Sequence, residues 1–276
     1  RLQTNATGII FNNDDPYVVD GWVKRSPTDL TDTPLRPGDR LVAVDGTPVV
    51  VSADRDRFFT FPRLEKELTL RFERKGKEFD MTVAPVSSDA MKTLLYDSWV
   101  DENRRIVDSL SGGRVAYVYM KDMGTQSLEK FLIDMTGIAL GKEALILDIR
   151  NNRGGNVHDD VIRFLSQKPY LEWQARNGKR SPQPNFAPSG GPIILLVNEQ
   201  SLSDAEMTAA AFRQLKMGTI VGTETYRWII FTSGRTLVDG SSTRLPAWGC
   251  YDLDGNDLEK TGVKPDVYVR TTFGDM

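Results

Sequence analysis

The sequence contains a single cysteine, Cys250, and a single histidine, His158. One cysteine excludes an intrachain disulfide, and one histidine excludes a histidine-rich zinc site and any mechanism that needs two histidines. No apolar run approaches the roughly 20 residues that a membrane-spanning helix requires. The 35 basic and 38 acidic residues are well mixed, without the basic block that favours nucleic acid binding. We therefore expect no metal, no cofactor, no membrane span and no nucleic acid partner.

The composition is that of an ordinary soluble, globular protein. Of the 276 residues, 39% are hydrophobic and 26% are charged, and a chain of this length typically forms two domains. The sequence starts with RLQTNATG, without a methionine or a signal-like segment, which indicates a fragment or a processed product. Both the cytoplasm and the periplasm fit these features, and the sequence does not distinguish them.

Residues 1–87 are predicted to form a small β-rich domain. Short apolar runs such as Ile9–Phe11 and Arg40–Val44 are separated by turn-forming residues. Residues 35–49 read LRPGDRLVAVDGTPV and resemble the signature of PDZ domains, which bind extended peptide ends along a sheet edge. A plain β-barrel module without a ligand is the alternative. Residues 88–113 are predicted to form a helix that links this domain to the next.

Residues 114–276 have the pattern of an α/β domain. Buried strands are predicted at residues 115–119, 144–149, 193–197 and 219–221, and helical segments lie between them. This alternation favours a parallel sheet, whose ligands gather where strands end and helices begin. Residues 178–191 are polar and rich in proline, and they are predicted to form a loop.

A serine stands at one of these strand-to-helix turns. Ser203 follows the strand at residues 193–197 and begins a helix whose expected apolar face is Met207, Ala210, Ala211 and Leu215. A hydroxyl at such a tip is exposed and has the positive end of a helix behind it, which favours a nucleophile. The sequence S-x-x-E, with Glu206 as its last residue, is equally the pattern of a capping box, which is a structural role.

A second turn carries paired glycines, Gly154 and Gly155, after the strand at residues 144–149. Glycines at a helix start leave backbone N–H groups uncovered, so that they can bind a negatively charged oxygen. A tight turn that needs positive φ explains the same pair without any ligand. The segment is not a phosphate-binding loop, because it lacks both the Lys-Ser/Thr ending and the G-x-G-x-x-G spacing.

Four segments in this order resemble the tricorn protease and C-terminal processing peptidase superfamily. They are residues 148–156 (DIRNNRGGN), 197–206 (VNEQSLSDAE), 221–225 (VGTET) and 262–269 (GVKPDVYV). The PDZ-like segment before them fits the same superfamily, and residues 98–123 look like the tricorn branch in particular. The resemblance implies an α/β fold, with a PDZ-like domain followed by a crotonase/ClpP-like serine peptidase core. It also implies a peptide substrate and makes a homo-oligomer plausible.

The superfamily contains two mechanisms, and the sequence argues against one of them. Processing peptidases use a serine–lysine dyad, with the lysine in a T-F-G-K-G-like stretch. Here that stretch is TYRWI, and Trp228 stands at the lysine position. Arg227 cannot replace the lysine, because a guanidinium does not deprotonate and cannot act as a base.

The tricorn branch uses a serine, a histidine and a glutamate. By resemblance, the nucleophile is Ser203, the glutamate is Glu259, and the oxyanion amides belong to Gly155 and Asp204. The tricorn histidine lies in a segment ahead of the PDZ-like domain, which this sequence does not contain. His158 is a weak alternative, because no matching motif places it as the base. We therefore expect the histidine from an N-terminal segment of the parent protein or from a partner chain.

Two other functions compete with a serine peptidase. The first is a non-catalytic peptide-binding protein, with a PDZ domain on a degenerate peptidase core, and the missing base favours it. The second is a crotonase-like acyl-CoA enzyme, which also places oxyanion amides at helix starts. The PDZ-like segment and the surroundings of Ser203 argue against the acyl-CoA enzyme.

Overall fold

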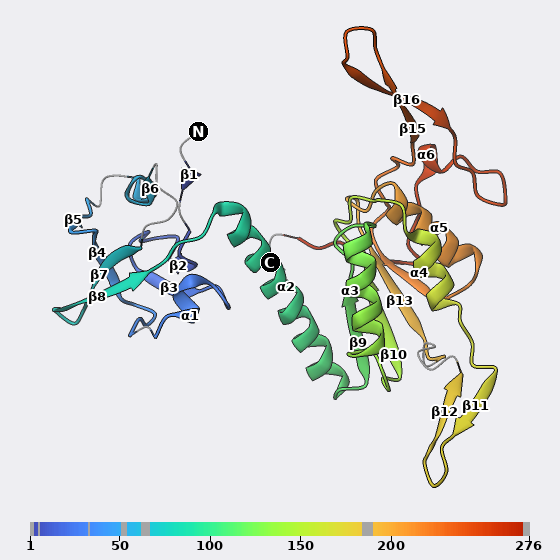
Figure 1. Cartoon of the computed structure of the whole chain (residues 1–276), viewed down its shortest axis with the longest axis horizontal. Helices are drawn as coiled ribbons and strands as arrows, with labels where there is room; N and C mark the ends of the chain where they lie inside the picture. Colours follow the sequence, from blue (N-terminus) through green and yellow to red (C-terminus); the bar gives the residue numbers. More distant parts are fainter. Residues whose placement is uncertain are drawn as a thin grey trace. The chain divides into compact units, whose positions relative to one another are not determined.

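The computed structural model describes residues 3–4, 6–32, 34–50, 54–61, 67–183 and 190–272. The chain folds as two compact units, residues 1–102 and 103–276 (Figure 1). The boundary between them lies within the long helix α2 (Ser88–Ser111). In the described residues, no helix is long and apolar enough to cross a membrane.

The first unit is built from short antiparallel strands. Its main sheet has the order β5–β4–β7–β8, formed by Thr47–Pro48, Arg40–Val44, Leu68–Arg74 and Lys77–Val83. A hairpin pairs β2 (Ile9–Phe11) with β3 (Val19–Trp22), and β1 (Gln3–Thr4) pairs with β6 (Thr60–Phe61). The short helices are α1 (Pro27–Leu30) and the 3-10 turn η1 (Arg55–Phe58). Alternate residues of β7, Leu68, Leu70 and Phe72, are buried in the core of this unit.

The second unit is organised around a parallel sheet in the order β17–β14–β13–β10–β9. These strands are Val267–Tyr268, Thr219–Gly222, Ile193–Val197, Ala144–Asp148 and Val115–Tyr119. The helices α3 (Thr125–Thr136), α4 (His158–Leu165) and α5 (Asp204–Gln214) connect successive strands. Each pair of neighbouring strands in this sheet is parallel, as the alternation of strands and helices predicted.

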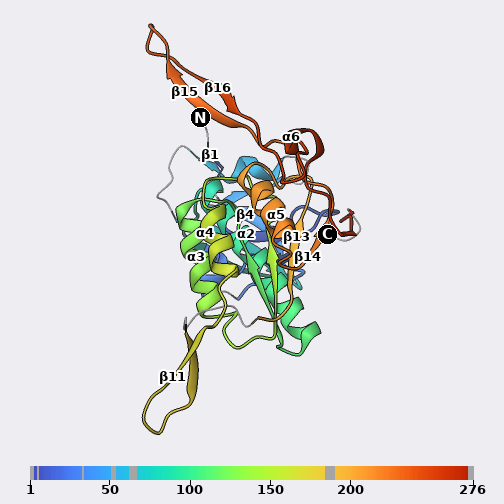
Figure 2. The ribbon, with the colours of Figure 1, turned by 90° about the vertical axis from the view of Figure 1, so that its right-hand side faces the viewer.

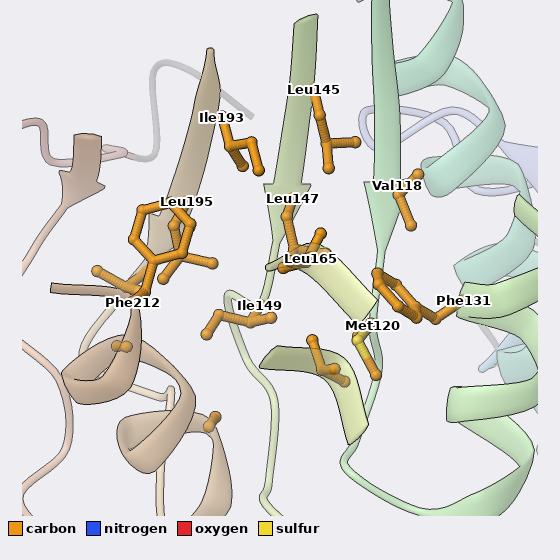
Figure 3. Packing of buried hydrophobic residues seen from close by; sticks show 14 of the residues in the cluster. Val118, Met120, Phe131, Leu145, Leu147, Ile149, Leu165, Ile193, Leu195 and Phe212 are labelled. Atoms are coloured by element: carbon orange, nitrogen blue, oxygen red, sulfur yellow. The ribbon is translucent and has the colours of Figure 1, made fainter. Parts of the chain in front are cut away.

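The core of the second unit lies between one face of the sheet and these helices. Figure 3 shows Leu145, Leu147 and Ile149 pointing to the same side as Leu195 on the neighbouring strand. Side chains of α3, α4 and α5 complete this cluster, including Phe131, Leu165 and Phe212. The sheet and its helices therefore fix the position of each strand-to-helix turn.

The predicted inward face of α5 was wrong. The buried apolar residues are Ala205, Ala209 and Phe212, whereas Leu215 is 58% exposed. Small residues at positions 205 and 209 allow the helix to lie close to the sheet. The sequence pattern placed the start of the helix correctly but assigned the wrong face as buried, because alanines occur on both sides of the helix.

Two hairpins were not predicted. One pairs β11 (Leu171–Gln174) with β12 (Arg180–Gln183), and the other pairs β15 (Phe231–Thr236) with β16 (Ser242–Trp248). Figures 1 and 2 show both hairpins extending away from the sheet of the second unit. Part of the predicted loop at residues 178–191 is thus strand β12, while residues 184–189 lie outside the described residues. Most hairpin residues are exposed, so no alternation of apolar and polar residues marks them.

Candidate active site

The turns after β10 and β13 are joined to each other by side-chain and backbone hydrogen bonds. Asn151 and Asn198 form a pair, in which the Asn151 N–H donates to Asn198 Oδ1 and Asn198 Nδ2 donates to Asn151 Oδ1, both at 2.9 Å. The Leu202 N–H donates to the Asn152 carbonyl at 3.0 Å. The two strands are neighbours in a parallel sheet, so both turns emerge at the same edge.

Ser203 stands at the tip of the second turn in an unusual backbone conformation. Its φ of 58° and ψ of −118° place it in a region that glycine adopts far more easily than other residues. Holding serine there costs on the order of 1–3 kcal/mol. Gly154 lies directly behind it, because a Cβ at position 154 would be 2.7 Å from the Ser203 Cβ. A strained serine between a strand and a helix is the arrangement of a nucleophile elbow.

Glu206 fixes this turn, and sequence reasoning saw only part of its role. Its carboxylate is fully buried and accepts four hydrogen bonds. Oε2 accepts from the N–H groups of Ser203 (3.0 Å) and Trp228 (2.8 Å). Oε1 accepts from the Thr225 hydroxyl and from the Arg227 N–H, both at 2.7 Å. The predicted contact of Glu206 with the Ser203 amide is confirmed, and the S-x-x-E pattern was its signal.

Two backbone amides beside Ser203 remain uncovered. Among the residues that the structure describes, the N–H groups of Gly155 and Asp204 have no hydrogen-bond acceptor in the chain. Of the paired glycines, only Gly155 has this property, because the Gly154 N–H donates to Asn152 Oδ1 at 2.9 Å. The Asp204 amide is also the first of helix α5, where the helix dipole favours negative charge.

The Asp204 side chain holds the start of helix α4. Its Oδ2 accepts from the N–H groups of Val157 (2.8 Å) and His158 (3.1 Å). Its Oδ1 lies 2.5 Å from His158 Nδ1. This contact raises the pKa of His158, against the opposing effect of burial. The Nδ1 atom of His158 therefore faces Asp204, and no hydrogen bond joins His158 to Ser203 in the described part of the chain.

In the described residues, no hydrogen bond joins Glu259 to Ser203. It is exposed on the short helix α6 (Leu258–Thr261), and its N–H donates to Asp257 Oδ1 at 3.1 Å. The segment that follows this helix is joined to the Glu206 network, because the Val263 N–H donates at 2.8 Å to the Thr225 hydroxyl, which in turn donates to Glu206. The helix that carries Glu259 is thus connected to the Glu206 network, although Glu259 itself contacts neither Ser203 nor His158 in the described residues.

A second buried carboxylate anchors the glycine turn. Asp148, the last residue of β10, is fully buried and accepts from Arg150 Nη2 at 2.6 Å and from the Tyr117 hydroxyl at 2.7 Å. Burial, followed by the charge of Asp148, raises the pKa of Tyr117, which keeps its hydroxyl a donor. Sequence reasoning missed this group, because Asp148 and Tyr117 come from different strands.

The chain resembles known peptidases in sequence and in structure. Residues 114–269 match the sequence family described as Peptidase family S41. Tricorn protease homolog 1 of Streptomyces coelicolor is 31% identical over 89% of this chain and 23% of its own length. The tricorn protease of Thermoplasma volcanium is 27% identical over 90% of this chain and 24% of its own. The chain therefore spans about a quarter of the length of these relatives.

The structural comparison agrees. A crystal structure of the tricorn protease superimposes on 97% of this chain, and on 27% of that protein, with a TM-score of 0.82 at 26% identity. The likeness includes both units of the chain. It covers the β-rich first unit as well as the parallel sheet and turns of the second.

Proposed function

We propose that this chain, which belongs to peptidase family S41, forms the nucleophile-bearing part of a serine peptidase of the tricorn type. The observation that carries the proposal is the strained Ser203 beside two backbone N–H groups, those of Gly155 and Asp204, that have no acceptor among the described residues. A merely structural cap would need neither feature, because a serine cap adopts extended backbone angles without strain.

The reaction would proceed through an acyl-enzyme on Ser203. Its Oγ attacks the carbonyl carbon of the scissile peptide bond while a base takes the hydroxyl proton. The N–H groups of Gly155 and Asp204 stabilise the negative oxygen that forms. The Ser203 N–H does not contribute, because it donates to Glu206. The proton passes to the leaving amine as the C–N bond breaks, and water then hydrolyses the ester to release the acid and restore Ser203.

The base is proposed to be a histidine outside these residues, oriented by Glu259. His158 is the only histidine in the sequence, and no hydrogen bond joins it to Ser203 in the part of the chain that the structure describes. The exposed Glu259 carboxylate, on a helix tied to the Glu206 network, is open to a group that arrives from elsewhere. Cleavage of peptides within the chain, as an endopeptidase, is part of the same proposal.

Labelling with a fluorophosphonate serine probe tests this function. We expect Ser203 to be labelled in the full-length parent protein and to lose the label in the Ser203→Ala variant. It should react at least about 100-fold more slowly in the isolated 276-residue chain, because the proposed histidine base lies outside these residues. Equal labelling of the isolated chain that disappears in His158→Asn would identify His158 as the base instead. No labelling of either protein would contradict the peptidase assignment.

One cavity favours peptide binding by the first unit as a second function. It has a volume of about 260 Å³ and lies along β2. Its lining includes Ile9, Phe11, Phe59, Met91 and Leu95. In the described residues, β2 pairs with β3 alone, so its other edge can accept an extended peptide as a further strand. We propose a PDZ-like role for this unit, which would hold a peptide whether or not Ser203 is catalytic.

The Leu95→Glu variant tests this binding. Leu95 is 49% exposed, so the change should leave folding intact while placing a charge in the apolar groove. We expect the affinity for a fluorescent peptide with an apolar C-terminal residue to fall by about tenfold or more, measured by anisotropy. Leu110→Glu is the matched control, because Leu110 lies on the same helix, is 85% exposed and does not line the cavity. Unchanged affinity in Leu95→Glu would rule the groove out.

A further inference from the structure

Two partly exposed aromatic rings lie next to the Ser203 turn. Tyr226 and Trp228 stack with their ring centroids 5.7 Å apart and an angle of 28° between the planes. Their exposed fractions are 49% and 50%. Large aromatic rings bind apolar groups well, and the exposed half of this stacked pair is apolar surface that a ligand can contact.

The backbone beneath the rings is held by the same groups that hold the nucleophile. The Tyr226 N–H donates to the Ser201 carbonyl at 3.0 Å. The Trp228 N–H donates to Glu206 Oε2, the oxygen that also accepts from the Ser203 N–H. Because both amides bond to one atom, the backbone of Trp228 lies beside that of Ser203. The rings are therefore carried on a fixed support next to the nucleophile, as a binding subsite requires.

The charges around the rings favour a neutral ligand. Arg227, between the two aromatics, forms an ion pair with Glu224 at 2.8 Å. Glu206 is buried and fully occupied by its four donors. The half-exposed Trp228 indole itself offers apolar surface and takes no proton.

We propose that Tyr226 and Trp228 form a subsite for an aromatic or large aliphatic side chain of the peptide substrate, close to the scissile bond. This inference rests on the proposed peptidase function, and it adds the class of side chain that is preferred. The occupant is a substrate peptide, because the support of the rings is shared with Ser203 rather than with a surface remote from it.

Peptide binding without turnover tests the subsite. Short fluorescent peptides, blocked at both ends and differing only in phenylalanine or alanine at the central position, would be titrated by anisotropy against the Ser203→Ala chain. We expect the phenylalanine peptide to bind about 3- to 10-fold more tightly. This preference should disappear when Tyr226→Ala or Trp228→Ala is added. Both side chains are half exposed, so both variants should fold.

The control variant is Trp173→Ala. Trp173 is 60% exposed on β11, in the hairpin that this strand forms with β12. Its removal should leave the preference intact. A preference that survives both Tyr226→Ala and Trp228→Ala would overturn the subsite. The subsite would also be overturned if sedimentation showed that these variants dissociate a dimer, because a second copy of the chain would then cover the rings.

The same experiments separate this inference from the proposed function. Loss of the phenylalanine preference in both variants, together with probe labelling of Ser203 in the full-length protein, supports both. Labelling of Ser203 with a preference that the variants do not change overturns the subsite and leaves the peptidase in place. A preference that depends on the rings in a protein that never labels supports an apolar peptide site and contradicts the peptidase.

Discussion

The variant Glu206→Gln is expected to lose about 3 kcal/mol of unfolding free energy. The Glu206 carboxylate is fully buried and uses both oxygens as acceptors, each for two donors. Glutamine keeps one oxygen and replaces the other with an NH₂ group, which is itself a donor. Two of the four donors would then face another donor in a site that water does not reach. Urea or guanidinium unfolding of the purified chain measures the loss.

Glu199→Gln provides the matched control. Glu199 is on the turn before Ser203, but it is exposed and accepts one side-chain hydrogen bond, from the Thr223 hydroxyl at 2.6 Å. A glutamine oxygen can accept the same bond, so we expect a change within about 0.5 kcal/mol. Equal stability of Glu206→Gln and Glu199→Gln would show that the Glu206 network does not stabilise the turn.

Glu206→Gln should also slow the reaction of Ser203 in the protein that remains folded. When the anchor is weakened, the Ser203 backbone can relax from its strained angles, and the neighbouring Asp204 amide moves with it. Probe labelling of the full-length protein, under conditions in which the variant is folded, should slow by at least about tenfold. A purely structural role for Glu206 would leave the labelling rate of the folded fraction unchanged.

The sequence alone predicted the framework of the second unit well. Strands β9, β10, β13 and β14 fall at the predicted positions, because short runs of Val, Ile and Leu are typical of buried parallel strands. The alternation with helices then predicts that the turns meet at one edge of the sheet. Local patterns are sufficient here, because each element carries its own signal.

The network around Glu206 could not be predicted in the same way. Three of its donors, Thr225, Arg227 and Trp228, come 19 to 22 residues later in the chain. No spacing rule joins residues across a helix and a strand. The backbone strain at Ser203 could not be predicted from the sequence either, because an S-x-x-E pattern indicates an ordinary helix cap. Tertiary contacts, rather than local preference, decide both features.

The two exposed hairpins are a second feature that the sequence pattern could not predict. All residues of β11 are exposed, and so are most of those in β15 and β16. Neither face of these strands is therefore buried against a hydrophobic core. Their strands are defined by pairing across a turn. The sequence of β16 also contains Pro246, which argues against a central strand but is allowed in a ribbon with free edges. A pattern based on burial therefore misses them.

Gly155→Ala is the second variant for which we expect a large effect, again about 3 kcal/mol of unfolding free energy. A Cβ at position 155 would lie 2.0 Å from the carbonyl oxygen of Met123 and 2.2 Å from its carbonyl carbon. These are backbone atoms, so no side chain can move aside. The Asn156 N–H donates to that same oxygen at 2.8 Å, and the Met123 N–H donates to the Gly154 carbonyl at 2.9 Å. A shift that relieves the clash would weaken both bonds.

Gly234→Ala separates this clash from the general effect of adding a methyl group. Gly234 lies in β15 with no atom within 4 Å of its Cβ position, so its replacement should change stability by less than about 0.5 kcal/mol. The Gly155 variant should also label more slowly in the full-length protein, because its uncovered amide is displaced together with the backbone. Unchanged labelling in a destabilised Gly155→Ala would assign Gly155 to the packing of the turn against Met123. The Asp204 amide would then be left as the donor to the oxyanion.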